Sequence, residues 1–120
     1  IRLGMLDGVA MKPARCGGLL TGRRQIEIVA DAGLMWLASG LTDPDVSLAA
    51  ALALFSSYGQ SRPCALNGPQ FLAHSVVDAP FTPRNGQLAP PIGPGLGVVV
   101  NEAKVRAIAA PVAATARWSG

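Results

Sequence analysis

Aromatic and charged residues are scarce in this sequence, and their scarcity excludes several classes of protein. Only 5% of the 120 residues are aromatic and 14% are charged, while 50% are hydrophobic. Disordered chains combine low hydrophobicity with high charge, so this composition predicts a globular core. The net charge of +3 is spread along the chain, with Arg23-Arg24 as the only adjacent basic pair. Nucleic-acid-binding surfaces gather basic residues on one face, so we expect no nucleic-acid partner.

Long hydrophobic runs, cysteine clusters and paired histidines are also missing. The longest mostly apolar run covers residues 46–55, well short of the roughly 20 residues that span a bilayer. We therefore expect no membrane partner. Cys16 and Cys64 have no metal-ligand spacing, and two thiols in a chain of this size fit a reducing cytoplasm better than a disulfide scaffold. His74 is the only histidine and lies in a polar stretch, which favours a surface role.

Three short apolar runs predict buried strands, because each is bounded by turn-forming residues. The runs span residues 8–13, 34–39 and 64–66. Helical segments separate them, and buried strands that alternate with helices are typical of a parallel sheet covered by helices. The sequence therefore predicts an α/β fold in which the three strands are parallel neighbours.

Two helices are predicted between these strands. Thr21 is the expected N-cap of the first helix, which we expect to run to about Ala32. Its predicted buried face consists of Ile26, Val29, Ala30 and Gly33. The second helix covers residues 46–58, with Asp43 or Asp45 as its N-cap. It is apolar nearly all round, which predicts that it is largely buried.

The composition changes after about residue 72. Asn85-Gly86 lies between two extended segments, and this dipeptide is the strongest short-range signal for a hairpin, here predicted over residues 78–90. A stretch rich in glycine and proline follows. Asn101 is then expected to cap a last helix that ends near Ala109, and residues 110–120 are expected to be a frayed tail.

Four short motifs occur in order along the chain. They are residues 7–19 (DGVAMKPARCGGL), 39–43 (SGLTD), 67–72 (NGPQFL) and 85–98, which contains NGQL and GPGLGV. Together they resemble the C-terminal third of enzymes in the mandelate racemase and muconate lactonizing enzyme group of the enolase superfamily. Each motif is weak alone, but four in the same order and spacing make a specific match. The resemblance implies the C-terminal strands and helices of a (β/α) TIM-like barrel, followed by a segment that returns to an α+β capping domain.

The resemblance divides the chain into two parts. Residues 1–72 would belong to the barrel and residues 73–120 to the capping domain. The chain opens with Ile1, and residues 2–6 look like the tail of a helix without a start signal, so we expect the chain to begin inside a larger protein. A barrel needs about 250 residues to close. We therefore expect this piece to need the rest of the barrel and to be inactive alone.

Lys12 is the strongest candidate for a catalytic base. In an arbitrary protein, a lysine at a strand end is more often a surface residue. Here Gly8, Ala10 and Lys12 share one face of the strand, and these small residues suit the crowded interior of a barrel, while Val9 and Met11 share the other face. The resembled group places a lysine at this point, and barrel active sites lie at the C-terminal ends of strands. A lysine between apolar walls and near a divalent cation has its charged form disfavoured, which lets an amine act as a base.

The other candidate residues follow the later strands. Asp43 stands where the resembled group usually has a glutamate, and the resemblance implies an acid that orients Lys12 or contacts the substrate. A helix N-cap is an equally good interpretation of Asp43. Ser39 and Leu41, in the same motif, are candidate substrate-binding residues. Asn67 could bind substrate or simply make the turn after the third strand, and the turn is the favoured interpretation.

The resemblance also implies a reaction and a cofactor. Enzymes of the group abstract the proton α to a carboxylate of a small substrate with the help of Mg²⁺. Their metal ligands are acids on barrel strands that this chain does not include, so we expect Mg²⁺ in the complete enzyme and no metal ligand here. A lysine at position 12, rather than an aspartate paired with a histidine, favours the muconate cycloisomerase subgroup over mandelate racemase.

Two alternatives stay open. The first is a racemase or epimerase of an amino-acid derivative on the same scaffold. Residues 65–67 (ALN) lack the Asp-x-Asp of dipeptide epimerases, which argues against an α-amino dipeptide as the substrate. The second alternative is a truncated, non-catalytic barrel fragment. For the complete enzyme we expect a cytoplasmic homo-oligomer.

Overall fold

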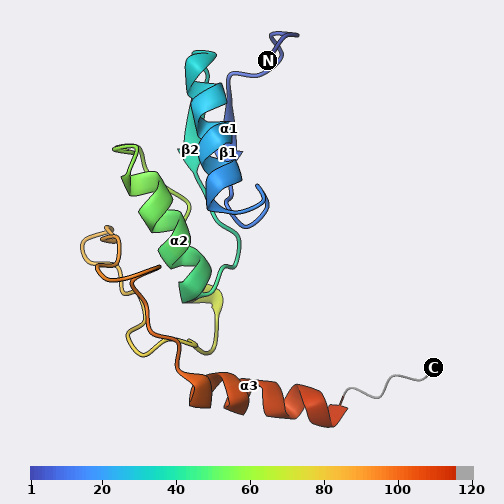
Figure 1. Cartoon of the computed structure of the whole chain (residues 1–120), viewed down its shortest axis with the longest axis vertical. Coiled ribbons are helices and arrows are strands. Elements are labelled where there is room, and N and C mark those ends of the chain that lie inside the picture. Colours follow the sequence, from blue (N-terminus) through green and yellow to red (C-terminus); the bar gives the residue numbers. More distant parts are fainter. Residues whose placement is uncertain (116–120) are drawn as a thin grey trace, which may run out of the picture.

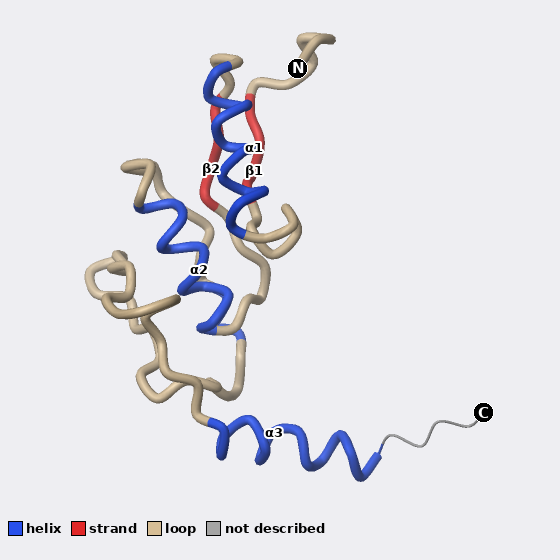
Figure 2. Tube along the Cα trace, in the orientation of Figure 1, coloured by secondary structure: helices blue, strands red, loops and turns tan. Residues whose placement is uncertain are grey.

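The chain folds into a small α/β unit followed by an irregular segment and a projecting helix (Figure 1). The computed structural model describes residues 1–115, with side chains described to residue 110. The elements in order are β1 (Gly8–Met11), α1 (Leu19–Asp31), β2 (Met35–Ala38), α2 (Asp45–Ser56), the 3₁₀ turn η1 (Gly68–Phe71) and α3 (Glu102–Thr115). Figure 2 shows the two strands together with α1 and α2, while α3 lies apart from them. The alternation of strands and helices in the first part confirms the predicted α/β fold.

The sheet is parallel, as predicted. β1 pairs with β2 so that Met11 stands opposite Ala38. Directly after β2, Ser39 forms a parallel bridge with Ala65. The Ala65 amide donates to the Ala38 carbonyl at 3.1 Å, and the Gly40 amide donates to the Ala65 carbonyl at 2.8 Å. The third predicted strand is therefore parallel to its neighbour, but it is reduced to this single bridge.

The hydrophobic core lies between one face of the sheet and the two helices α1 and α2. Its buried members are Met11, Ile26, Ala38, Ala51, Leu54 and Phe55. Trp36 of β2 packs against this cluster and stacks on Phe55, with ring centroids 5.8 Å apart. Full burial of a large apolar side chain contributes about 1.5–3 kcal/mol, so this cluster decides which face of each strand turns toward the helices. Ala10 lies on the opposite face of β1 and is exposed.

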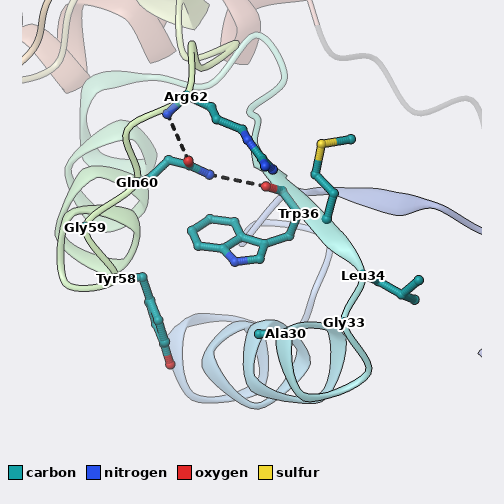
Figure 3. A pocket seen from close by; sticks show the side chains of 9 residues that line it. Ala30, Gly33, Leu34, Trp36, Tyr58, Gly59, Gln60 and Arg62 are labelled. Atoms are coloured by element: carbon teal, nitrogen blue, oxygen red, sulfur yellow. Dashed lines mark hydrogen bonds between the residues drawn. The ribbon is translucent and has the colours of Figure 1, made fainter.

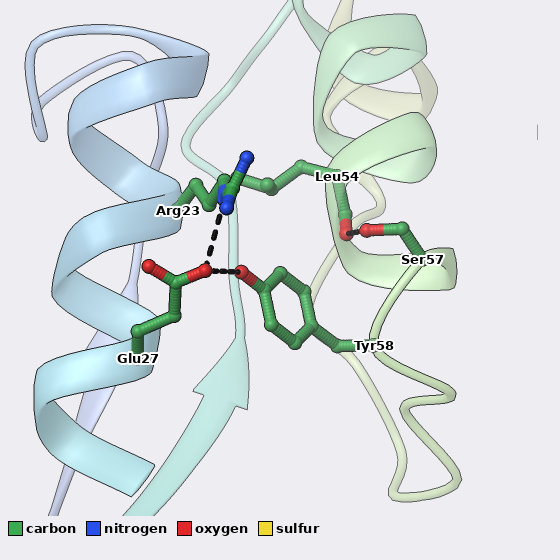
Figure 4. Close-up of polar contacts among 5 residues, drawn as sticks. All are labelled: Arg23, Glu27, Leu54, Ser57 and Tyr58. Carbon is green, nitrogen blue, oxygen red and sulfur yellow. Dashed lines mark hydrogen bonds and ion pairs between the residues drawn. The ribbon is translucent and has the colours of Figure 1, made fainter. Parts of the chain in front are cut away.

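A polar link joins α1 to the end of α2 (Figure 4). The Glu27 carboxylate accepts hydrogen bonds from Arg23 Nε at 2.9 Å and from the Tyr58 hydroxyl at 3.1 Å. The hydrogen bond from Arg23, followed by that from Tyr58, lowers the pKa of Glu27. Burial and the hydrogen bond to Glu27 raise the pKa of Tyr58. Because the side chains of Arg23 and Glu27 are 62% and 43% exposed, this link adds little stability.

α1 begins earlier than the sequence predicted. It starts at Leu19 after Gly18, whose φ of 91° is open to glycine, so the predicted N-cap at Thr21 is wrong. The buried residues of α1 are Gly22, Ile26 and Val29. Ala30 and Gly33, which the periodicity places on the same face, are exposed. Gly33 lies beyond the end of the helix at Asp31 and has a positive φ of 69°, so helical periodicity does not extend to it.

Asp45 connects α2 to the segment that follows η1. α2 begins at Asp45 directly after Pro44, and no side chain caps it, so the predicted cap by Asp43 or Asp45 is wrong. Asp45 is only 1% exposed. Its carboxylate accepts hydrogen bonds from the Ser75 hydroxyl at 2.7 Å and from the Phe81 amide at 2.8 Å. A carboxylate is also favoured at a helix N-terminus by the helix dipole, so Asp45 is a stable anchor for the returning chain.

The segment between η1 and α3 contains one tight turn. Arg84 and Gln87 exchange two backbone hydrogen bonds of 2.9 Å around Asn85 and Gly86. Both central residues have positive φ, 50° and 73°, as a type I′ turn requires. The predicted turn is confirmed. The predicted hairpin over residues 78–90 is wrong in extent, because its arms form only this one bridge.

α3 is capped as predicted but runs further. Asn101 Oδ1 accepts a hydrogen bond from the Lys104 amide at 2.9 Å, which confirms the N-cap. The helix continues to Thr115, so the predicted end near Ala109 and the frayed tail from residue 110 are wrong as far as the helix extends. The rest of that predicted tail, residues 116–120, lies outside the described residues. The Lys104 amine donates to the Val77 carbonyl at 2.7 Å and holds α3 to the returning segment.

The described chain is more extended than a self-contained domain of its size. Its radius of gyration is 16.9 Å, whereas a compact domain of this length has about 14 Å. Large apolar side chains such as Leu3 and Ile92 are exposed by 82% and 98%. Residues 1–6 form a single turn instead of the predicted helix tail. Within the described residues, none of the helices is long and apolar enough to cross a membrane.

We expect Asp45→Ala to lower the free energy of unfolding of the complete protein by about 1–3 kcal/mol, because the Ser75 hydroxyl and the Phe81 amide lose a buried acceptor. Urea denaturation followed by circular dichroism measures this change. Asp31→Ala is the matched control, since Asp31 is exposed and surface substitutions change stability by about 0.5 kcal/mol or less. Equal effects of the two substitutions would show that Asp45 does not anchor the returning segment.

Candidate active site

Polar residues follow the strands and meet at one edge of the sheet. Lys12 comes directly after β1, and Ser39 comes directly after β2. They are the next pair in the register that sets Met11 opposite Ala38. Asn67 lies two residues after Ala65, which forms the parallel bridge with Ser39 at the end of β2. Because the strands are parallel, all of these residues lie at their carboxyl ends, which is where barrel enzymes carry their active sites.

Lys12 and Ser39 are joined by a short hydrogen bond. The Lys12 amine donates to Ser39 Oγ at 2.6 Å. Ser39 is 7% exposed and Lys12 is half-buried. Lys12 lies on the face opposite Met11, so its side chain turns away from the helices, as strand alternation predicts. Its backbone is also held, because the amides of Arg15 and Cys16 donate to the Lys12 carbonyl at 2.8 and 3.0 Å.

Asp43 shapes the loop after β2. Its Oδ2 accepts a hydrogen bond from the Leu41 amide at 2.7 Å. Two glycines let this loop pack closely: a Cβ would stand 2.6 Å from Asp43 Oδ2 at Gly40, and 2.4 Å from the Asp43 amide nitrogen at Gly68. In the described part of the chain, no ion pair joins Lys12 to Asp43. The carboxylate is thus engaged by its own loop, and Lys12 is engaged by Ser39.

Leu41 and Asn67 differ from Ser39 in exposing their side chains. Leu41 is 40% exposed. Asn67 is exposed and directly precedes η1, and its carbonyl accepts a hydrogen bond from the Gln70 amide at 3.1 Å. Its side chain makes no capping bond. Asn67 therefore makes the turn and also leaves its side-chain amide open to a ligand.

The histidine and the two cysteines are the remaining candidates for catalysis or metal binding. His74 and Cys64 are exposed, and Cys16 is half-buried. Cys64 is exposed as a residue, but partial burial of its thiol raises the pKa of Cys64, which disfavours the reactive thiolate. Over residues 1–115, no three side chains of His, Cys, Asp or Glu are grouped so that they could hold a metal ion.

A hollow of about 450 Å³ lies at the other end of the sheet (Figure 3). Trp36 and Tyr58 form part of its wall. Gln60 Nε2 donates to the Trp36 carbonyl at 3.3 Å, and the Arg62 amide donates to Gln60 Oε1 at 3.1 Å. These residues surround the amino end of β2, whereas Lys12 and Ser39 follow the carboxyl ends. The hollow is therefore separate from the candidate active site.

Sequence reasoning missed two contacts at the site. It did not connect Ser39 with Lys12. Each of them is the first residue after a parallel strand, and residues at equal positions in neighbouring parallel strands lie side by side, so the contact could have been predicted. It gave Gly68 only a turn-forming role. The close approach of Gly68 to the backbone of Asp43 has no signal in the sequence, because the two residues are 25 positions apart and belong to different loops.

Comparison with known proteins supports the predicted fold and family. The family model described as "Enolase C-terminal domain-like" matches residues 1–104. An N-succinylamino acid racemase from Amycolatopsis sp is 33% identical over 82% of this chain, and muconate cycloisomerase 1-1 from Acinetobacter lwoffii is 30% identical over 88% of it. Among solved structures, muconate lactonizing enzyme from Klebsiella pneumoniae matches 88% of the chain with a TM-score of 0.82 and 28% identity.

This chain is much shorter than these relatives. It spans 27% of the racemase, 28% of the cycloisomerase and 30% of the Klebsiella enzyme. The TM-score of 0.82 to the Klebsiella enzyme supports the prediction that this chain forms the C-terminal portion of a (β/α) barrel.

We expect Gly68→Ala to disturb the loop that carries Asp43. The new Cβ would meet backbone atoms of Asp43 and Leu41 at 2.4–2.8 Å, and these cannot move aside as a flexible side chain can. Strain of this kind costs about 1–3 kcal/mol, which thermal unfolding of the complete protein measures.

Gly22→Ala is the matched control for this substitution. There the new Cβ meets two side chains and no backbone, the tip of Leu54 at 3.2 Å and Cys16 Cβ at 4.0 Å, and alanine favours the helix. If Gly68→Ala were tolerated as well as Gly22→Ala, the proposed close packing of the loop would be wrong.

Proposed function

This chain belongs to the enolase C-terminal domain-like family, and we propose that the complete protein is a muconate cycloisomerase-like isomerase that abstracts the proton α to a carboxylate of a small substrate. The names of its relatives, racemase and cycloisomerase, agree with an enzyme that moves a proton at carbon. The observation that carries the proposal is the position of Lys12 at the carboxyl end of β1, with its amine turned away from the helices and held by Ser39 at 2.6 Å.

Lys12 is the proposed base. Abstraction requires a neutral amine whose lone pair reaches the proton on the α-carbon of the substrate. In this proposal the Lys12 side chain points into the interior of the barrel, where the substrate would bind. Positioned proton transfer of this kind accelerates a reaction by about 10²–10⁴-fold. Racemisation follows when the α-carbon, after losing its proton to Lys12, is reprotonated on its opposite face by a group from the rest of the barrel. In cycloisomerisation, Lys12 takes the α-proton of a lactone as the C–O bond at the neighbouring carbon breaks, and in the reverse direction protonated Lys12 gives its proton to the α-carbon as that bond forms.

Asp43, Leu41 and Asn67 are proposed to form the substrate side of the site. Asp43 would act by fixing the loop through the Leu41 amide, at 2.7 Å, and its second carboxylate oxygen stays available to the substrate. Leu41 offers an exposed apolar side chain, and Asn67 offers an amide that can donate to a carboxylate or accept from a neutral group.

Mg²⁺ is proposed as the cofactor of the complete enzyme. The described residues offer no group of side chains that fits a metal ion, so the ligands would come from the part of the protein outside this chain. The contribution of the present residues is then to hold the base and to shape the loops around the substrate.

The second candidate is a racemase that acts on an N-acylated amino acid. It is favoured by the relative named N-succinylamino acid racemase, which is 33% identical over 98 residues. Incubation of the complete protein with cis,cis-muconate and with N-succinylamino acids separates the candidates, because ultraviolet absorbance follows loss of the diene and polarimetry follows racemisation. Lack of activity toward both classes, together with no exchange of α-protons in a wider carboxylate panel, would favour the non-catalytic fragment.

We also propose that the complete enzyme acts in the cytoplasm as a homo-oligomer. The cytoplasm is supported by the two cysteines, Cys16 and Cys64, both of which are free. The oligomeric state rests on the family resemblance alone.

We expect Lys12→Arg in the complete enzyme to reduce exchange of the substrate α-proton with solvent deuterium by about 10²-fold or more, because arginine stays protonated and cannot accept the proton. Proton NMR in D₂O measures the exchange on whichever substrate the complete enzyme turns over, an N-succinylamino acid or the lactone formed from cis,cis-muconate. Lys104→Arg is the matched control, because Lys104 is the other lysine of the chain and lies on α3. Exchange at the wild-type rate in Lys12→Arg would show that Lys12 is not the base.

A further inference from the structure

We propose that Ser39 is a positioning residue for Lys12, and that it acts by holding the amine of the base rather than by binding substrate. This inference rests on the proposed role of Lys12. It replaces the substrate-binding role that the motif suggests for Ser39, because its hydroxyl is already occupied: the Lys12 amine donates to Ser39 Oγ at 2.6 Å.

The hydroxyl gives the amine a defined direction. Ser39 Oγ accepts from Lys12 and can itself donate to the Gly40 carbonyl at 3.4 Å, a long contact that selects this orientation of the hydroxyl. A neutral amine has two N–H bonds and one lone pair in tetrahedral geometry. When one N–H points at Ser39, the lone pair must point elsewhere, so the hydrogen bond keeps it free for the substrate.

The hydroxyl is itself fixed by the sheet. The Ser39 amide donates to the Met11 carbonyl at 3.0 Å, and the next amide, that of Gly40, donates to the Ala65 carbonyl at 2.8 Å. Ser39 is thus held on both sides by neighbouring strands and is 7% exposed. A lysine side chain otherwise has high rotamer entropy. A rigid acceptor removes part of that freedom before the substrate binds, and preorganisation of this kind raises the rate of the chemical step.

The same contacts argue against Ser39 as a nucleophile activated by Lys12. Serine and lysine do form such pairs in some hydrolases, but these also need free backbone N–H groups to bind the oxyanion. Here the amides of Ser39, Gly40 and Leu41 all have acceptors, namely the carbonyls of Met11 and Ala65 and the carboxylate of Asp43. The three amides nearest the hydroxyl are therefore unavailable, and positioning is the role that the geometry supports.

The test compares Ser39→Thr with Ser39→Val in the complete enzyme. The two side chains have nearly the same shape, and only threonine keeps the hydroxyl. The probe is exchange of the α-proton of N-succinylamino acids in D₂O, or loss of cis,cis-muconate if that is the substrate turned over. We expect Ser39→Thr to keep most of the activity and Ser39→Val to lose about 10–100-fold in kcat, with KM changed by less than about threefold.

Three results would overturn the inference. Equal activity of Ser39→Thr and Ser39→Val, whether high or low, would show that the hydroxyl does not matter. A raised KM with unchanged kcat in Ser39→Val would assign Ser39 to substrate binding. Covalent labelling of Ser39 by a fluorophosphonate, absent in Ser39→Thr, would make it a nucleophile. Ser39→Ala serves if the valine variant does not fold, since alanine adds no bulk and also removes the hydroxyl.

Failure of the proposed function has a different signature. If Lys12→Arg were as active as the wild type, Lys12 would not be the base, and Ser39 would have no base to position. If Lys12→Arg were inactive while Ser39→Val kept full kcat, the proposed function would stand and only the role of Ser39 would fall.

Discussion

The in-register parallel pairing of β1 with β2 is the constraint on which the rest of this structure depends. Side chains alternate between the two faces of a strand, so a slip by one residue would move every side chain to the other face. The register sets Met11 opposite Ala38, both inside the core. It thereby places the next pair, Lys12 and Ser39, on the open face, where their side chains meet. The free energy of burying the core thus determines the geometry of the candidate base.

A second level of organisation lies in the loops that follow the strands. The loop with Leu41 and Asp43 is closed by a hydrogen bond of 2.7 Å and packs against Gly68 of the next loop. Just beyond it, Asp45 starts α2 and binds the returning chain through Ser75. Function is commonly carried by loops on a rigid scaffold, and here the loops are made rigid by contacts with one another as well as with the sheet.

The sequence predicted those features that depend on neighbouring residues. Apolar runs gave the strands, alternation within residues 8–13 separated Met11 from Lys12, and Asn85-Gly86 gave a turn with positive φ at both residues. Prediction from the sequence failed where the role of a side chain depends on a partner far away in the chain. Asp45 looks like a helix cap, but Phe81, 36 residues later, takes its carboxylate.

The predicted cap at Thr21 failed for a local reason. Gly17 and Gly18 both adopt positive φ, which lets the chain turn into α1 two residues before the first side chain that could cap it.

The position and the basicity of Lys12 depend on different parts of the protein. Its position is set within this chain, by the strand register, by the amides that bind its carbonyl and by Ser39. Its surroundings are incomplete here, since Lys12 is half-buried and Ala10 on the same face is exposed. An amine becomes an effective base when apolar walls and a nearby cation disfavour its charged form. In the proposed enzyme those walls and that cation would come from the other strands of the barrel. A chain of this length can therefore specify where the base stands while leaving its chemistry to the rest of the protein.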